Sequence, residues 1–260
     1  YNLDWVEDPS NQNLAYARVR LRKLLPSLEA EQISAAALAG TANRLASVRK
    51  TLECQTARVL AVTSELSSFG YARIRLEALI NEDPEIAYRV LDRLLGAIGG
   101  HLYPIRHQSL VNLLENIQES KLKVSRTLAG CIVLPQNEHL LVVREAARCE
   151  KQKTIAGPWQ TWDGRYRVRI TGPRIPKKQK FFIRPLGSNL GQKIIEKNKK
   201  NTLTELNPAV CKALPSIWDH RGLVCVPHLG YRRTKSNPAS VIDAQIEFLP
   251  KRPVTHAFFS

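Results

Sequence analysis

The period of the apolar residues changes near residues 120–126, and this change restricts the fold more than any other feature of the chain. Ahead of it, apolar residues recur every seven positions, at Leu38, Leu45, Leu52, Val59 and Leu66. This spacing predicts one face of a long helix over 33–66 that packs against neighbouring helices. A coiled-coil partner is the alternative, but the seam lacks flanking acidic and basic residues. After residues 120–126, short β-rich runs predict strands, so we expect an α+β fold.

Capping residues mark further helices in the first 120 residues. Asp8-Pro9-Ser10-Asn11 reads as a turn and N-cap cluster ahead of a helix over 14–28. Asp83, with Pro84 in the first turn, begins another helix that Gly99-Gly100 ends. A further helix is expected over 107–119. We therefore predict a helical domain over 29–122.

The remaining 138 residues, 123–260, are predicted to form a small basic α+β domain with antiparallel strands. The runs 127–134 and 140–144, separated by Pro135-Gln136-Asn137-Glu138, predict a hairpin. Trp162-Asp163-Gly164 predicts a turn into a strand over 165–170. Further short strands are expected over 181–183, 223–226 and 246–249, and short helices over 191–200 and 208–214.

The positive charge of the chain is concentrated in its second part. Residues 1–150 hold 18 basic and 17 acidic side chains, a net of +1, whereas residues 151–260 hold 21 and 6, a net of +15. A one-sided excess of this size is typical of a surface that binds a polyanion such as nucleic acid.

Several classes of protein are excluded. No uncharged apolar stretch approaches the roughly 18 residues that span a bilayer, and no targeting peptide is present, so we expect a cytoplasmic protein without a membrane partner. The five scattered cysteines form no Cys-x-x-Cys pair and are interpreted as small apolar residues. The histidines lack ligand spacing, so no metal site is expected. The absence of methionine, even at position 1, suggests a fragment.

The basic residues of 165–200 form the most specific candidate for RNA binding. Alternation along a strand would turn Tyr166, Val168 and Ile170 to the core and line up three arginines on the other face, about 6.6 Å apart. This spacing is close to that of phosphates along a nucleic-acid strand; a solvated face is the alternative. The predicted tRNA-binding residues are Arg165, Arg167, Arg169, Lys177, Lys178, Lys180, Lys193 and Lys197.

A second candidate lies near the N-terminus. Arg18 and Arg22 are four residues apart on one helix face, just after the cap cluster of Asp8, Ser10 and Asn11. Their guanidinium groups suit the phosphates of a nucleotide or of RNA. A solvated cap and helix is the alternative.

Several runs together resemble the tRNA(Ile)-lysidine synthetase family of PP-loop ATP pyrophosphatases. The strongest similarity lies at 4–28, in Glu7-Asp8-Pro9-Ser10-Asn11-Gln12-Asn13, Tyr16, Arg18, Arg22 and Leu24-Leu25-Pro26. Further similar runs are Thr127-Leu128-Ala129-Gly130-Cys131, Arg144-Glu145, Trp162-Asp163-Gly164-Arg165 and Leu214-Pro215-Ser216-Ile217-Trp218-Asp219. The resemblance implies that 1–28 is the tail of a catalytic domain with a connecting helix.

The resemblance also implies a reaction. Family members adenylate the wobble cytidine of an isoleucine tRNA, and the amine of lysine then displaces AMP to form lysidine. ATP with Mg is the cofactor of the full enzyme, and tRNA(Ile), lysine and ATP are its partners; a homodimer is left open. The family's Ser-Gly-Gly-x-Asp-Ser loop is absent from this sequence. We therefore expect a C-terminal fragment that needs no cofactor, has no identified catalytic residue and is inactive alone.

The alternative interpretation is a non-catalytic RNA-binding protein, or a degenerate remnant of the synthetase. An upstream reading frame with a Gly-Gly-x-Asp-Ser loop would distinguish it from the ligase fragment.

Overall fold

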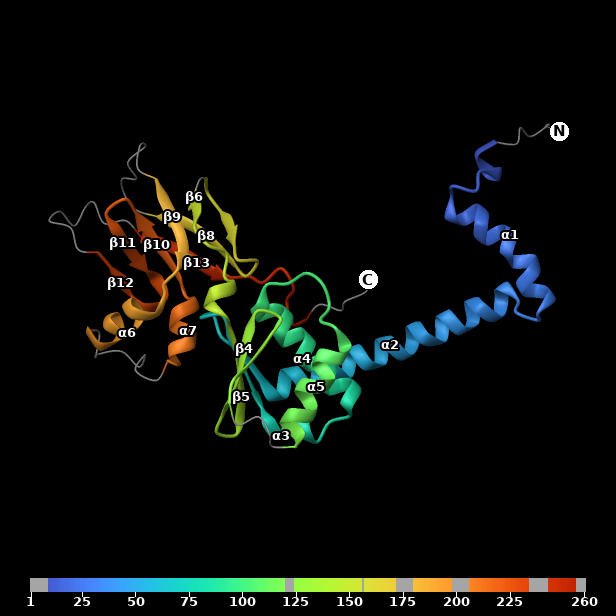
Figure 1. The fold of residues 1–260 in the computed structure, drawn as a ribbon, viewed down its shortest axis with the longest axis horizontal. Coiled ribbons are helices and arrows are strands. Elements are labelled where there is room, and N and C mark those ends of the chain that lie inside the picture. The colour runs from blue at the N-terminus through green and yellow to red at the C-terminus, as the bar shows by residue number, and fades with distance from the viewer. Residues whose placement is uncertain are drawn as a thin grey trace. The chain divides into compact units, whose positions relative to one another are not determined.

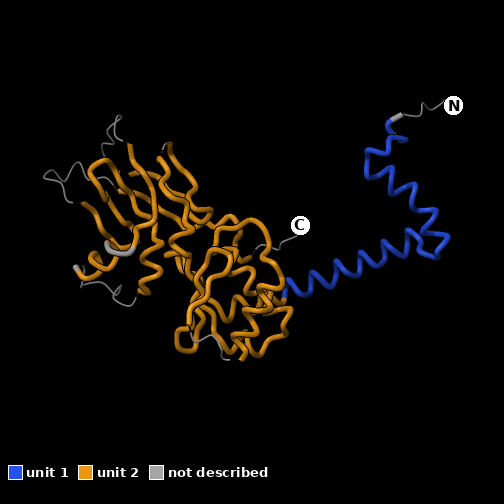
Figure 2. Tube along the Cα trace, in the orientation of Figure 1, with its two compact units in different colours: residues 1–54 blue, residues 55–260 orange. Residues whose placement is uncertain are grey.

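The computed structural model describes residues 9–119, 124–155, 157–171, 180–197, 206–233 and 243–255. The chain forms two compact units, residues 1–54 and 55–260 (Figure 2). Within the described residues, no helix combines the length and the apolar character needed to cross a membrane.

The first unit is helical. It contains a 3-10 turn at Pro9–Gln12, helix α1 at Ala17–Ala30, and the first part of α2, which extends over Ala35–Thr63 into the second unit. The predicted cap cluster does not cap α1, because α1 begins eight residues after Pro9 and its N-cap is Tyr16. Ser10 lies in the 3-10 turn, whereas Asp8 and the side chain of Asn11 lie outside the described residues.

The second unit is built around a five-stranded antiparallel sheet, sheet A, with the order β1-β2-β5-β4-β3. Its strands are β1 (Ser64–Leu66), β2 (Tyr71–Arg75), β3 (Arg126–Leu128), β4 (Cys131–Gln136) and β5 (His139–Arg144). The predicted β4–β5 hairpin is confirmed. β1 and β2 were not predicted, because Leu66 continues the seven-residue period although α2 ends at Thr63.

Three helices accompany sheet A, namely α3 (Leu76–Ile80), α4 (Pro84–Gly99) and α5 (His107–Gln118) (Figure 1). The predicted ends of α4 are confirmed. The carboxylate of Asp83 accepts a hydrogen bond from the backbone NH of Glu85, and Gly100 takes the left-handed conformation with φ of 68°. The predicted helix over 107–119 is likewise present as α5.

Two further sheets pack face to face. Sheet B has the order β12-β11-β10-β9-β6, and sheet C has the order β13-β8-β7. The strands of sheet B are β6 (Lys153–Ile155), β9 (Phe181–Pro185), β10 (Pro215–Asp219), β11 (Gly222–Val226) and β12 (Tyr231–Arg232). Those of sheet C are β7 (Gln160–Trp162), β8 (Tyr166–Thr171) and β13 (Asp243–Phe248). Buried side chains of both sheets, such as Trp162 and Val168 of sheet C and Ile217 of sheet B, form one core.

A second core joins sheet A to helices α6 (Ser188–Lys197) and α7 (Pro208–Ala213). Leu141 and Val143 of β5 pack there with Ile194 of α6 and Val210 of α7. Helices α6 and α7 therefore cover apolar side chains of sheet A, which is also accompanied by helices α3, α4 and α5. The α+β class predicted from the sequence is confirmed.

The last described residues return to α4. The side chain of Arg252 forms an ion pair with Asp92 and packs over Gly96, where a β-carbon would collide with its guanidinium group. Arg93 donates a hydrogen bond to the carbonyl of Val254, at 3.1 Å. Residues 249–255 thus connect sheet C to the helices that accompany sheet A.

The predicted division at 122/123 stays a prediction, since residues 120–123 lie outside the described part of the chain. β2, which precedes this position, pairs with β5, which follows it, from Tyr71 opposite Val143 to Arg75 opposite His139.

Candidate nucleic-acid interface

The turn between β7 and β8 organises the candidate site. The backbone NH of Arg165 donates to the carbonyl of Trp162, and the two residues between them, Asp163 and Gly164, both have positive φ, 53° and 64°. This combination is typical of the type I′ turn, for which Asp-Gly is a preferred sequence. The turn that Trp162-Asp163-Gly164 predicted is therefore confirmed, and it holds the carboxylate of Asp163 inside the protein.

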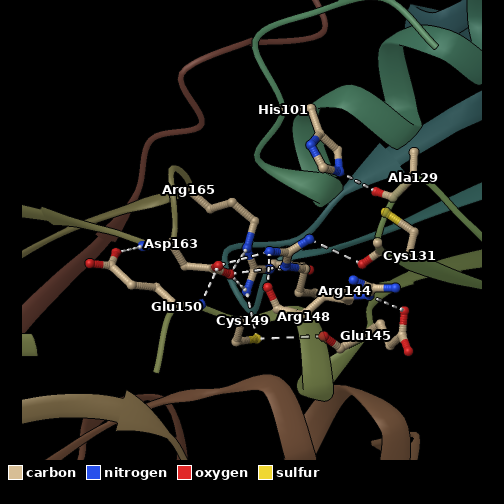
Figure 3. Close-up of polar contacts among 12 residues, drawn as sticks. His101, Ala129, Cys131, Arg144, Glu145, Arg148, Cys149, Glu150, Asp163 and Arg165 are labelled. Carbon is tan, nitrogen blue, oxygen red and sulfur yellow. Dashed lines mark hydrogen bonds and ion pairs between the residues drawn. The ribbon is translucent and has the colours of Figure 1, made fainter. Parts of the chain in front are cut away.

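Asp163 lies between two buried arginines (Figure 3). Arg144 donates to both carboxylate oxygens, from Nε at 3.1 Å and from a terminal nitrogen at 2.9 Å. Arg165 donates from Nε at 2.8 Å, and one of its terminal nitrogens forms an ion pair with the same carboxylate oxygen, also at 2.8 Å. The backbone NH of Glu150 gives Asp163 a further hydrogen bond of 2.8 Å. We call Arg144, Asp163 and Arg165 the arginine–aspartate cluster.

Asp163 and Arg144 keep their charges despite burial. Burial alone would raise the pKa of Asp163, but Arg165, Arg144 and the NH of Glu150 outweigh it and hold this pKa below its ordinary range. Burial would lower the pKa of Arg144, yet the bond to Asp163 raises it overall. Asp163 is therefore ionised at neutral pH, and the guanidinium group of Arg144 is charged.

Glycines allow α4 to approach the turn closely. A β-carbon on Gly100 would lie 2.5 Å from the carbonyl oxygen of Asp163, and one on Gly164 would lie 2.7 Å from that of Gly100. Both residues have positive φ, where a side chain is also strained. The end of α4 and the β7–β8 turn therefore meet backbone to backbone, and this contact fixes the cluster between sheets A and C.

Three of the runs that carry the family resemblance meet at this cluster. They are 127–131, at the β3–β4 turn; Arg144-Glu145, at the end of β5; and 162–165, at the β7–β8 turn. An open pocket of about 390 Å³ adjoins them, and its lining includes Thr127, Gly130, Arg148 and Glu145. Of the other runs, 214–219 lies mostly in β10 of sheet B, where Asp219 pairs with Arg233, and the run at 4–28 lies in the first unit.

The structure places Arg165 differently from the other two arginines of the predicted face. Its side chain is 1% exposed, because it precedes β8 and turns toward Asp163. The strand alternation predicted Arg165 on the outer face with Arg167 and Arg169, and this prediction is wrong for Arg165, which is buried against Asp163. The predicted burial of Tyr166 and Val168 is confirmed, and Ile170 is partly buried against the same core.

Arg167 and Arg169 do lie together on the outer face of β8. Their guanidinium carbons are 4.6 and 4.7 Å from the centre of the indole of Trp159. Arg167 also pairs with Glu247, and Arg169 donates to the side-chain oxygen of Gln245, at 2.6 and 2.9 Å. Since Gln245 is neutral, this contact does not offset the positive charge of the Arg169 side chain.

The predicted lysines occupy other elements. Lys180 is exposed just before β9, and Lys193 is exposed on α6. Lys197 is the last residue of α6, but its side chain is outside the described residues, as are Lys177 and Lys178. The structure therefore brings together Arg167, Arg169 and Trp159, and leaves Lys180 and Lys193 on separate elements.

Arg18 and Arg22 are both exposed on α1, as the predicted helix requires. The guanidinium carbon of Arg18 lies 5.6 Å from the centre of the ring of Tyr16.

The roles of Arg144 and Asp163 were missed by sequence reasoning. Asp163 stands two residues from Arg165, which is the one available signal for an ion pair. Arg144 is 19 residues away from Asp163 in the sequence, and only the tertiary contact between the end of β5 and the β7–β8 turn brings them together.

No family model matches the chain. It is 27% identical, over 93% of its length, to the tRNA(Ile)-lysidine synthase of Wolbachia pipientis wMel, of which it covers 54%. It is 30% identical, over 87% of its length, to that of Ruegeria pomeroyi, of which it covers 50%. It is 24% identical, over 92%, to that of Orientia tsutsugamushi, of which it covers 56%. The resemblance to these synthases is confirmed, and the chain spans about half the length of the curated relatives it matches.

Proposed function

We propose that this chain is the tRNA-binding part of an enzyme that modifies tRNA(Ile), like the lysidine synthases to which it is related. The observation that carries this proposal is the similarity over most of the chain to proteins of that name. The +15 net charge of residues 151–260 supports it, because a polyanionic partner would match such a surface.

Arg167, Arg169 and Trp159 are proposed as the first contact with RNA. The pair of Arg167 with Glu247 is more than a third exposed on both sides, so exchanging the carboxylate for a phosphate costs little. Arg169 needs no exchange, since its partner is neutral. Both guanidinium groups lie over the indole of Trp159, and this contact holds them in position at the surface.

The complete enzyme is proposed to use ATP and lysine to convert the wobble cytidine of tRNA(Ile) to lysidine. Adenylation would make the cytidine oxygen a good leaving group before the lysine amine attacks. This chain has no Ser-Gly-Gly-x-Asp-Ser loop, so we propose that it contributes RNA binding and not the adenylation. Arg18 and Arg22 are proposed as phosphate contacts at its N-terminal end.

The proposal is tested by titrating the 260-residue chain with a tRNA(Ile) transcript over a range of salt concentrations. The double variant Arg167→Gln/Arg169→Gln should lower the slope of log affinity against log salt by about 1.4–1.8, because each phosphate contact contributes roughly 0.7–0.9. The matched control is Arg44→Gln/Arg49→Gln on α2, which removes two exposed charges that no proposal assigns to RNA.

Equal slopes for the double variant and the wild type would exclude this arginine surface. Absence of tRNA binding by the wild type would refute the function itself. ATP–pyrophosphate exchange is measured in parallel with tRNA and lysine present, and clear turnover by this chain alone would contradict its assignment as a non-adenylating part.

A further inference from the structure

A second pocket lies apart from the arginine–aspartate cluster, beside β2, the β4–β5 turn and the start of α7. Its volume is about 350 Å³, within the range of small-ligand sites. Its polar lining comes from Tyr71 and Arg73 of β2, Gln136 and Asn137 at the β4–β5 turn, and Asn207 ahead of α7. The pocket thus combines one cation, one aromatic ring and three carboxamides.

Arg73 is the unusual member of this lining. Its cross-strand neighbours are Leu141 in β5 and the exposed Glu65 in β1. The Nε atom of Arg73 is shielded from solvent and has no hydrogen-bond partner among the described residues. A shielded donor on a charged group is costly when it stays unbonded, so this atom points to a ligand with an acceptor oxygen.

The other side chains suit a planar polar group next to that acceptor. The ring of Tyr71 is half-buried and can stack with a base, while the carboxamides can donate to and accept from its edge. Asn207 already accepts from the backbone NH of Ala209 through its side-chain oxygen, at 2.9 Å, which leaves its amide nitrogen as a donor. Asn137, which lines the pocket, has a φ of 54°, and this left-handed backbone conformation sets the shape of the β4–β5 turn.

We propose that this pocket binds a single unstacked nucleotide, with its phosphate on Arg73 and its base against Tyr71 between the carboxamides. This inference rests on the proposed function, since the RNA supplies the nucleotide. Free inorganic phosphate could make only the contact with Arg73. A nucleotide would make that contact and also place its base against Tyr71.

The test is calorimetric titration of the 260-residue chain with AMP, GMP, CMP and UMP, and separately with inorganic phosphate. We expect at least one nucleotide to bind more tightly than phosphate. Arg73→Gln should weaken that nucleotide roughly tenfold or more, because it removes a charge-assisted hydrogen bond. The matched control, Arg75→Gln, removes an exposed arginine from the same strand outside the pocket lining and should change affinity by no more than about twofold.

Asn137→Gly gives a second variant that preserves the fold, because glycine adopts positive φ freely. It should weaken nucleotide binding while leaving phosphate binding unchanged. Circular dichroism and thermal unfolding of each variant confirm that its fold is retained.

The proposal is overturned if no nucleotide binds more tightly than inorganic phosphate, or if Arg73→Gln and Arg75→Gln behave alike. In either case the wild-type titration with tRNA(Ile) still reports separately on the proposed function. Loss of tRNA binding by Arg73→Gln alone, with mononucleotide binding intact, would also contradict the pocket, since it would place Arg73 on the RNA by another route.

Discussion

Asp163→Asn removes the one carboxylate between two buried arginines and should destabilise the second unit strongly. The side chains of Arg144 and Arg165 are 7% and 1% exposed, so water cannot replace the lost charge. Breaking a buried ion pair by removing one partner costs about 3–5 kcal/mol. Asparagine tolerates the positive φ of this turn and keeps one acceptor oxygen, so we expect the lower end, about 3 kcal/mol.

Urea denaturation followed by circular dichroism measures this loss. For a unit of this size, about 3 kcal/mol corresponds to a fall in the thermal midpoint of about 6–12 °C. The matched control is Asp243→Asn, whose partner Arg232 has a side chain that is 58% exposed. It should lose no more than about 1 kcal/mol.

The pH dependence gives an independent check. Because the pKa of Asp163 is lowered on folding, its carboxylate stabilises the protein fully above the unfolded pKa of about 4, and this contribution is lost as the pH falls through the lower folded pKa. The difference in unfolding free energy between wild type and Asp163→Asn should therefore shrink below about pH 4. Equal losses for the two asparagine variants at neutral pH would refute this reasoning.

Two further predictions concern cysteines and glycines. Burial raises the pKa of Cys131 to about 12 and that of Cys149 to about 11. A thiol reagent at pH 8 should therefore label the exposed Cys54 in the native chain, and should label Cys131 and Cys149 only after unfolding. Rapid labelling of Cys131 or Cys149 in the native chain would contradict their burial. Gly100→Ala should destabilise by about 1–3 kcal/mol because of strain and its contact with the carbonyl of Asp163, whereas Gly40→Ala, in an open stretch of α2, should stabilise by about 0.5–1 kcal/mol. Comparison of thermal midpoints checks both glycine changes.

Local signals predicted the local structure well. Asp83, Pro84 and the Gly99-Gly100 pair fix the ends of α4 through capping and backbone conformation, which depend on neighbouring residues only. The same holds for the Asp-Gly turn ahead of β8 and for the β4–β5 hairpin.

Long-range pairing was not predictable in the same way. β2 is five residues long and is a strand because β5, more than sixty residues later, supplies its hydrogen bonds. The strand rule for alternate faces applies to Arg167 and Arg169, but Arg165 lies ahead of β8 and follows the turn instead. Charge counting located a basic region but could not separate an arginine that is used inside the protein from those that face outward.

The contact of residues 249–255 with α4 has a consequence for biosynthesis. Asp92 and Arg252 are 160 residues apart, so α4 leaves the ribosome long before its last partner is made. Until then, the space above Gly96 is unfilled and the carboxylate of Asp92 lacks this arginine. A chain that ends before residue 249 therefore carries an incomplete helical layer, however well its sheets have paired. Completion of the second unit therefore waits for the synthesis of residues 249–255, and we expect a chain cut short before them to be more sensitive to proteolysis.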